Sequence, residues 1–346
     1  MKRTLFVLIM ILLMTLAVMA AAAEYTVILP EGYEESGISY PVIYVMPDTA
    51  GKTDTSGLAG CLSERMAAGD GIGMIIVCPL FSEDDDPAAE MSGIIGEVDS
   101  TYRTIPDARH WAAAGTGRGG YLSYMLALAD DSPFGAAVSV RGDFSTGGTW
   151  DAGGVYDRVK ALYAADRTAL DRIYTYMDAP VDDEWTDLPG STDDLGALMI
   201  GYGTGSARHE FTVRPGIWDD AFLEESAGRV LNRLTGYMLE DLVEGLIAPA
   251  QAAVTTEDQT IDVMCSVDLK EGIAVHAPNG TEIVIGLDIN GEEAQKALTV
   301  TGPGTYPAAI TVRNNLTDNA EARMTLTLFG AKIDMGACRV MFKKGS

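Results

Sequence analysis

A glycine-rich turn at residues 115–119, Gly-Thr-Gly-Arg-Gly, has the pattern closest to a reactive site in this sequence. It follows an apolar strand and precedes a helix, and a sharp strand-turn-helix of this kind presents a nucleophile at its centre. The central residue is Gly117, which has no side chain and cannot attack a carbonyl carbon. Thr116 has a hydroxyl group, but we expect it to point to the other side of the turn. The pattern therefore predicts the shape of a nucleophilic site without the nucleophile.

The chain has only three histidines, so each can be tested as a general base. His110 begins the strand that leads into the turn, His209 precedes another predicted strand, and His276 lies near the C-terminus. His110 and His209 therefore belong at the end of the sheet opposite Gly117. We interpret all three as surface or strand-end residues rather than catalytic ones.

Three runs of acidic residues, 83–86, 182–184 and 193–194, are candidate cation ligands because Ca²⁺ prefers several carboxylate oxygens. None has the spacing of a recognisable calcium loop, and we interpret them as solvated loops. Paired carboxylates could also hydrolyse glycosides, but no pair is singled out. We predict no metal site, and no cofactor is implied.

Aromatic side chains could instead line a cleft for a sugar or an aromatic ligand. The four tryptophans are Trp111, Trp150, Trp185 and Trp218. Core packing is the simpler interpretation for Trp111.

Alternating strand and helix patterns extend from residue 24 to residue 247, which is typical of a mostly parallel sheet covered on both faces. Strands are predicted at 25–29, 41–46, 73–78, 110–114, 136–140, 197–202 and 210–213. Helices are predicted at 57–68, 91–102, 119–129, 156–176 and 219–246.

The pattern changes after residue 247. A linker at 248–256 leads into short alternating runs, with two strong hairpin signals at Asn279-Gly280 and Asn290-Gly291. We predict a small all-β, Ig-like sandwich domain over 257–346.

Composition excludes several partners. The chain has 346 residues, 50 acidic and 24 basic side chains and a formal charge of −26, so it would repel nucleic acids and anionic lipid headgroups. Residues 248–346 carry 12 acidic and 8 basic side chains, whereas residues 24–247 carry 38 and 14. The excess acid thus belongs to the first domain, where we expect a solvated surface.

Residues 1–23 have the pattern of a signal peptide: a basic start, an apolar run and small residues before the cleavage point. An uncleaved membrane anchor is the alternative. We expect no membrane span after cleavage and a secreted or periplasmic location. Export permits disulfides, and three pairings are open among Cys61, Cys78, Cys265 and Cys338; the pairs 61–78 and 265–338 would keep one bridge in each domain. Four buried free thiols are the alternative.

Residues 102–121, with a Tyr-Arg pair, an Asp-x-Arg step and the glycine turn in this order, resemble the esterase D and feruloyl-esterase-like family of α/β-hydrolases. The segments 40–46 and 133–137 are similar to the family's strand before the oxyanion loop and its strand after the turn. The resemblance covers about 24–246 and implies an α/β-hydrolase-like three-layer sandwich with a Ser-His-acid triad.

The residues that would carry the family's chemistry differ at every position compared. Gly117 stands where the family has its serine, and Trp218 stands at the position of the histidine. The glycine-containing turn at 201–206, compared with the family's acid position, has no carboxylate. Asp48 replaces a glycine of the oxyanion loop, where its charge would repel a developing oxyanion.

The sequence predicts an exported esterase-like protein that is catalytically inactive and has a binding role. The expected pocket consists of Asp48, Thr116, Gly117, Arg118 and Trp218, and its ligand would be a glycan, a small molecule or a protein. The first alternative is an active ester hydrolase with an atypical site, for example an acid from 182–194 with activated water. The second is an adhesive or structural surface protein in which the C-terminal domain is the functional part.

Overall fold

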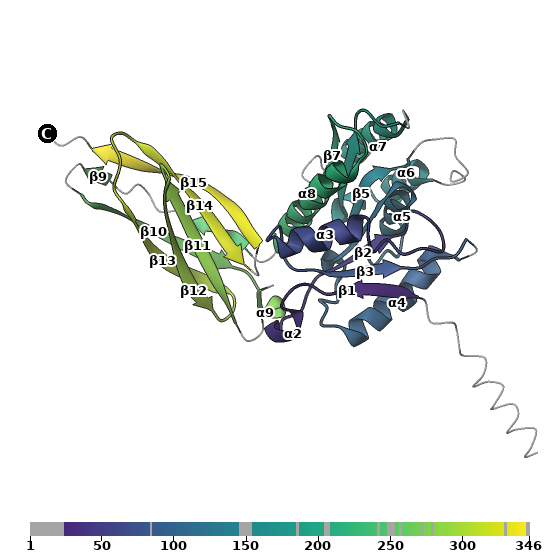
Figure 1. Cartoon of the computed structure of the whole chain (residues 1–346), viewed down its shortest axis with the longest axis horizontal. Helices are drawn as coiled ribbons and strands as arrows, with labels where there is room; N and C mark the ends of the chain where they lie inside the picture. The colour runs from purple at the N-terminus through teal and green to yellow at the C-terminus, as the bar shows by residue number, and fades with distance from the viewer. Residues whose placement is uncertain are drawn as a thin grey trace, which may run out of the picture.

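The computed structural model describes residues 24–83, 85–144, 154–184, 187–203, 208–240, 243–247, 253–255, 258–271, 273–277, 280–328 and 331–343 (Figure 1). The predicted signal peptide, residues 1–23, lies outside them, as do Trp150 and Trp185. No helix among the described residues combines the length and the apolar character needed to cross a bilayer.

The first domain is built around a seven-stranded sheet of order β1-β3-β2-β4-β5-β6-β7. All neighbouring strands are parallel except β1, which runs antiparallel to β3 at one edge. The central strands are fully buried because they are nearly continuous apolar runs, as strands covered on both faces must be. Their bounds are β1 (Tyr25–Ile28), β2 (Val42–Met46), β3 (Ile75–Pro79), β4 (Trp111–Thr116), β5 (Ala136–Gly142), β6 (Tyr174–Pro180) and β7 (His209–Arg214).

Helices cover both faces of this sheet, which gives three layers. One face packs against α3 (Leu58–Ala67) and α8 (Asp220–Leu239), which also contact each other. The other face packs against α4 (Pro87–Thr101), α5 (Gly117–Ala127), α6 (Val155–Ala165) and α7 (Asp187–Tyr202). Short helical turns complete the domain: α2 (Tyr33–Ser36), η1 (Ala108–His110) and η2 (Leu170–Arg172).

The sequence prediction was wrong between residues 156 and 202. The predicted helix 156–176 ends at Ala165, and its last residues belong to strand β6. The predicted strand 197–202 is the last part of helix α7, in which Leu195 and Met199 are buried one helical turn apart. A short apolar run fits a buried strand and the buried stripe of a helix equally well, which explains the error. With α7 in place, β6 and β7 have the crossover helix that parallel strands need.

The second domain is a sandwich of two sheets whose inward side chains share one core. Burial alternates along the strands, as expected where one sheet face is packed and the other is solvated. One sheet has the order β13-β10-β8 and the other β12-β11-β14-β15-β9. The bounds are β8 (Val243–Ile247), β9 (Ala253–Thr255), β10 (Thr260–Leu269), β11 (Thr281–Ile289), β12 (Glu292–Val300), β13 (Gly304–Arg313), β14 (Ala320–Leu328) and β15 (Ala331–Lys343), with α9 (Ile273–His276) after β10.

The hairpin predicted at Asn290-Gly291 is confirmed, since β11 and β12 pair directly across it. Both turn residues have positive φ, 50° and 81°, as a type I′ turn requires. No hairpin forms at 279–280, because β10 and β11 belong to different sheets; Asn279 itself lies outside the described residues.

Two short strands, in the region predicted as the end of a helix and a linker, belong to the sheets of the second domain. Helix α8 ends at Leu239, and β8, which the sequence assigned to the predicted helix 219–246, pairs with β10 of the second domain. Strand β9, within the predicted linker 248–256, pairs with β15. Short strands at sheet edges carry little sequence pattern, and only their pairing reveals them.

The predicted bridge between Cys61 and Cys78 does not form, and both are free thiols. Burial raises the pKa of the Cys78 thiol to about 12, so it stays protonated and unreactive. The side chain of Cys338 lies outside the described residues, and the pair 265–338 therefore stays a prediction.

Candidate functional site

The carboxyl edge of the seven-stranded sheet collects the loops that follow β2, β4, β5, β6 and β7, and an α/β sheet normally places its reactive groups there. The residues selected from the sequence all belong to these loops. They form two clusters: Asp48 with the turn at Gly117, and Trp218 with residues from the β5 and β6 loops.

The turn at Gly117 has the predicted form. Strand β4 ends at Thr116, Gly117 has a φ of +47°, and α5 begins at once. The flanking glycines are required by close packing: a Cβ on Gly115 would lie 2.3 Å from the backbone of Gly119, and a Cβ on Gly119 would lie 2.2 Å from the carbonyl oxygen of Met46. The glycine spacing is therefore a requirement of the backbone crossing and persists without a nucleophile.

Asp48, in the loop after β2, binds the turn. Its Oδ1 accepts a hydrogen bond of 2.7 Å from the backbone N–H of Arg118. This carboxylate satisfies one of the free N–H groups at the start of α5, a task that the Thr116 side chain does not perform. In a nucleophile elbow, the N–H of the residue after the nucleophile is a donor of the oxyanion hole. Here that donor is already occupied by an anion of the same chain.

The same carboxylate also takes the space of the nucleophile. A Cβ built on Gly117 would lie 2.2 Å from Asp48 Oδ1 and 3.0 Å from its Cγ. No side chain larger than hydrogen fits at position 117 unless Asp48 moves. Thr116, the other hydroxyl candidate, is half-buried and pairs through its backbone with Val140 of β5.

The second cluster joins Arg141, Asp183 and Trp218. The Arg141 guanidinium donates two hydrogen bonds to the Asp183 carboxylate, of 2.6 and 2.9 Å, and both residues are buried. The Trp218 ring lies beside the same guanidinium, with its centroid 5.2 Å from Cζ. Arg141 has a φ of +54°, a backbone conformation that residues other than glycine rarely adopt.

The sequence compared the family's acid position with 201–206 because it predicted a strand at 197–202, which the structure shows to be part of helix α7. The penultimate strand of the sheet is β6, and the segment after it, 181–184, contains three acidic residues. Among these, Asp183 is the buried one, and both of its oxygens accept from Arg141. A buried carboxylate therefore follows β6, and its partner is an arginine.

A buried network that the sequence did not predict lies deeper at the same edge. Asp178 of β6 accepts from Arg214 of β7 at 3.0 Å and from Ser226 of α8 at 2.9 Å. Arg214 also donates to Ser226 and lies over the Phe222 ring, 3.6 Å from its centroid. These groups satisfy one another, and we interpret the network as a connection between the two strands and α8.

The histidines lie where the sequence placed them. His110 precedes β4 and His209 begins β7, so both are at the amino edge of the sheet, opposite Gly117. His110 Nδ1 contacts Asp107 at 2.8 Å, and His209 Nδ1 lies 3.1 Å from Thr175 Oγ1. Burial lowers the pKa of His209 to about 4, which keeps it neutral near pH 7. The side chain of His276 lies outside the described residues.

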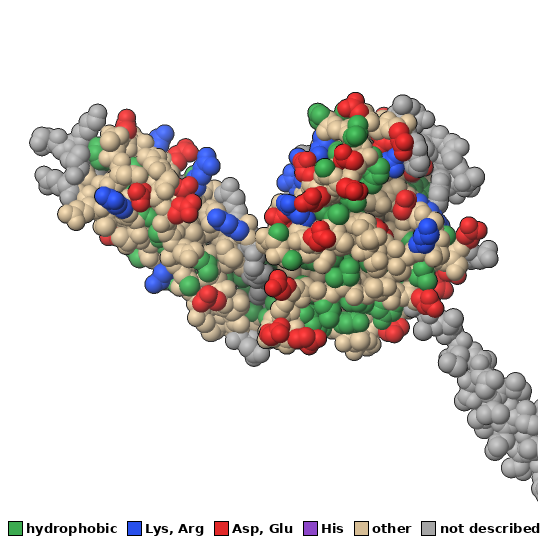
Figure 2. Space-filling view, in the orientation of Figure 1, with side chains coloured by type: hydrophobic (Ala, Val, Ile, Leu, Met, Phe, Trp, Pro, Cys, Tyr) green, Lys and Arg blue, Asp and Glu red, His purple; other side chains and the backbone are tan. Residues whose placement is uncertain are grey.

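The acidic runs are engaged or solvated where they are described. Asp85 accepts from the Ser82 N–H at 2.6 Å, and Asp86 caps α4 by accepting from the Ala88 N–H at 3.0 Å. Asp193 and Asp194 are exposed on α7, and Asp84 lies outside the described residues. No group of three or more His, Cys, Asp or Glu side chains suited to a metal ion occurs in the described part of the chain. Figure 2 shows acidic side chains scattered over the visible surface of the first domain rather than gathered at one point.

The contacts of the five residues of the expected pocket fall into two groups. Direct contacts join Asp48 to Gly117 and Arg118, whereas Trp218 contacts Arg141 and Phe222. The sequence singled out Asp48 and Gly117, and the structure brings them together at the turn. It did not single out Arg141, and it included Asp183 only within the acidic run 182–184; the signal for both was their position at or shortly after the end of a buried strand.

No protein-family model matches the chain, and no curated protein matches it. Solved structures do match. A ferulic acid esterase matches with a TM-score of 0.50 and 21% identity, over 62% of this chain and 92% of its own. A mutant of the feruloyl esterase module from Clostridium thermocellum, complexed with sinapinate, matches with a TM-score of 0.50 and 15% identity, over 62% of this chain and 83% of its own. At these identities the likeness establishes the fold of the first domain, which is the α/β-hydrolase fold predicted from the sequence.

Proposed function

We propose that this α/β-hydrolase-fold chain is an exported, catalytically inactive relative of esterases that acts by binding. The observation that carries the proposal is the position of Asp48, which holds the Arg118 amide and occupies the space where a nucleophile would stand. A carboxylate in an oxyanion hole disfavours the transition state of acyl transfer, because two negative charges would compete for the same donor.

The state of the acid and the base supports the same conclusion. A general base must accept a proton, and the indole of Trp218 can only donate one. Asp183 would need to orient a histidine, but both of its oxygens bind Arg141. An activated-water mechanism that uses an acid of 182–194 meets the same obstacle at Asp183, and nothing observed favours it.

A binding role is supported by exposed apolar side chains at this edge. Val181 and Ile217 are 50% and 59% exposed, and the loops that carry them are joined by hydrogen bonds from the Val181 N–H to Arg214 and from the Asp182 N–H to Gly216. Two exposed apolar side chains on loops that are joined in this way can contact the apolar surface of a ligand. The sequence leaves a glycan, a small molecule and a protein open as that ligand. Export rests on the pattern of residues 1–23.

Ester hydrolysis by the purified chain without residues 1–23 tests the proposal. We expect no saturable turnover of p-nitrophenyl acetate or methyl ferulate above the buffer rate, and no labelling by a fluorophosphonate, which phosphonylates reactive serines. Thr116→Val and Asp183→Asn serve as matched variants, because they remove the nearest hydroxyl and the nearest buried acid. A saturable rate that either variant lowers tenfold or more would overturn the proposal.

A further inference from the structure

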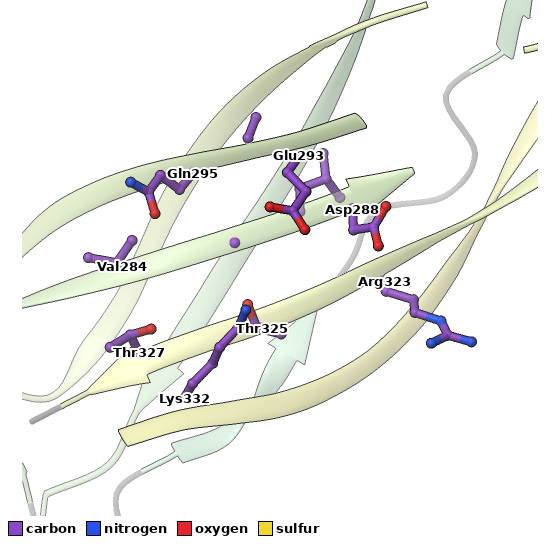
Figure 3. Close-up of a pocket in the computed structure, with 11 residues that line it drawn as sticks. Val284, Asp288, Glu293, Gln295, Arg323, Thr325, Thr327 and Lys332 are labelled. Carbon is purple, nitrogen blue, oxygen red and sulfur yellow. The ribbon is translucent and has the colours of Figure 1, made fainter. Parts of the chain in front are cut away.

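A groove of about 770 Å³ crosses the outward face of the five-stranded sheet of the second domain. Figure 3 shows that its labelled side chains come from four adjacent strands: Glu293 and Gln295 from β12, Val284 and Asp288 from β11, Arg323, Thr325 and Thr327 from β14, and Lys332 from β15. All stand on the side of the sheet opposite the core, since the residues between them along β11 and β14 are buried.

Gly286 forms the floor of the groove. It lies in the middle of β11, opposite Gln295 on one side and Thr325 on the other. A Cβ at this position would lie 2.4 Å from Thr325 Oγ1, so a larger side chain would displace that hydroxyl group. Glycine weakens a strand, and its presence in a strand interior often marks a place where a ligand approaches the backbone closely.

Several polar side chains along the groove have no partner among the described residues. Among the described residues, no hydrogen bond or ion pair engages the side chains of Glu293, Gln295 or Lys332. Asp288 and Arg323 face each other across the β11–β14 pair, yet they form no ion pair; Asp288 Oδ1 instead accepts from the Gly291 N–H at 2.9 Å. Carboxylate, amide, hydroxyl and cationic groups are therefore available together to an outside molecule.

The groove continues towards the end of the sheet. A second depression of about 400 Å³ shares Asp288 and Arg323 with the first and is also lined by Asn290, Asn319 and Glu321. The combined surface is elongated rather than round, which favours a ligand with several similar units over a compact molecule.

The chemistry of this surface selects among ligands. The two carboxylates of the larger groove are matched by two cations, so no net charge favours an ionic ligand. The backbones of β11 and β14, which form the middle of the groove, are paired with strands on both sides, so a peptide lying in the groove cannot pair with them as a further strand. Val284 adds an apolar area beside the polar groups on the outward face, which the C–H face of a sugar ring can contact.

We propose that this groove binds a neutral oligosaccharide. Alternating donors and acceptors would hydrogen-bond its hydroxyl groups, and Gly286 would allow a ring to approach the sheet. This proposal goes beyond the inactivity of the first domain and does not depend on it, because the two concern different domains.

Binding of the chain without residues 1–23 to immobilised neutral oligosaccharides tests the proposal, with acidic oligogalacturonates and a library of extended peptides as comparison probes. We expect at least one neutral oligosaccharide to bind with a dissociation constant measurable by calorimetry. Asp288→Ala/Arg323→Ala should weaken that binding at least tenfold, and Gln295→Ala severalfold. Lys296→Ala is the matched control, since Lys296 lies on β12 but pairs with the inward-facing Ile285.

Thermal unfolding of each variant separates a lost contact from a lost fold, because these side chains are exposed or half-buried and make few contacts. Absence of binding to every neutral oligosaccharide, binding that the double variant leaves unchanged, or preferential binding of peptides or acidic sugars would each overturn the proposal. None of these outcomes bears on the ester hydrolysis assays.

Discussion

Gly117 in the first domain and Gly286 in the second each lack a side chain at a place where a ligand could bind. The space beside Gly117 is filled, whereas the space beside Gly286 is open. At Gly117 in the first domain, the space is taken by Asp48, whose carboxylate also binds the Arg118 amide. At Gly286 in the second domain, the space forms the floor of an open groove, and the nearby side chains of Glu293, Gln295 and Lys332 have no hydrogen-bond or ion-pair partner among the described residues. The absence of a Cβ does not by itself show whether a ligand can bind. A centre is closed where the neighbouring polar groups are hydrogen-bonded within the chain, as at Gly117, and open where they are not, as at Gly286.

The largest expected effect concerns the buried ion pair between Arg141 and Asp183, in the second cluster of the first domain. Asp183→Ala would leave the buried Arg141 guanidinium without its carboxylate, and breaking a buried ion pair costs about 3–5 kcal/mol in the free energy of unfolding. Urea unfolding measures the loss. Glu184→Ala is the control, because its exposed carboxylate lies 3.7 Å from the same guanidinium and should contribute less than about 0.5 kcal/mol. Equal effects of the two substitutions would show that the buried ion pair is no stronger than the exposed contact, and that the satisfied polar groups of the first domain do not stabilise it.

The next effect concerns the edge of the sheet opposite Gly117. The pKa of His209 is lowered from 6.5 to about 4, so the folded chain resists protonation that the unfolded chain accepts. Stability should therefore be unaffected above pH 6.5, fall as the pH drops from 6.5 to 4, and be lower by about 3 kcal/mol below that range. Urea midpoints at several pH values measure the slope. In His209→Gln, the loss of stability between pH 6.5 and 4 should be smaller by this amount. An equal loss in the variant and in the original chain would show that His209 is not the group responsible.

A smaller effect tests the closed centre directly. Gly117→Ala places a Cβ on a left-handed residue and displaces Asp48, which together should cost about 2 kcal/mol. Asp48→Ala alone should cost about 1 kcal/mol through the lost bond to the start of α5. Because both substitutions remove that same bond, the double variant should be about 1 kcal/mol more stable than additivity predicts. Strict additivity in chemical denaturation would show that the two positions do not compete for one space.

The smallest effect is expected at the open centre. Gly286→Ala should change the free energy of unfolding by less than about 0.5 kcal/mol, since rotation of Thr325 offsets the gain from removing a strand glycine. The same denaturation experiment on Gly117→Ala provides the comparison. A loss at position 286 as large as that at position 117 would mean that the groove floor is packed as tightly as the turn.

The sequence predicted the parts of the fold that local patterns determine. The strand, turn and helix around Gly117 follow from a buried apolar run and close-packed glycines, and the β11–β12 hairpin follows from the Asn290-Gly291 pair. The same reasoning failed at β6, because its first residues continue the helical pattern of the preceding segment and a short buried strand shows no alternation that would distinguish it from a helix.

The candidate centres depended on information that a single sequence lacks. Asp183 stands in an acidic run typical of a solvated loop, and only the tertiary position of Arg141 shows that it is buried and paired. The groove at Gly286 needed the register of three strands, because Gln295 and Thr325 become neighbours only through pairing. The position of Asp48 in the loop after β2 could be predicted, because the apolar run at 41–46 identifies that strand and Asp48 follows it directly.

The contact between Asp48 and the turn also constrains how this chain can change over generations. A substitution that introduces serine at position 117 alone meets a carboxylate at 2.2 Å, and a substitution at position 48 alone removes a bond without supplying a nucleophile. Each single step is expected to lower stability, so a change at one of these positions is tolerated better when the other position changes with it. On the proposal that the chain is inactive, a hydrolytic descendant would need both changes and also a base at position 218.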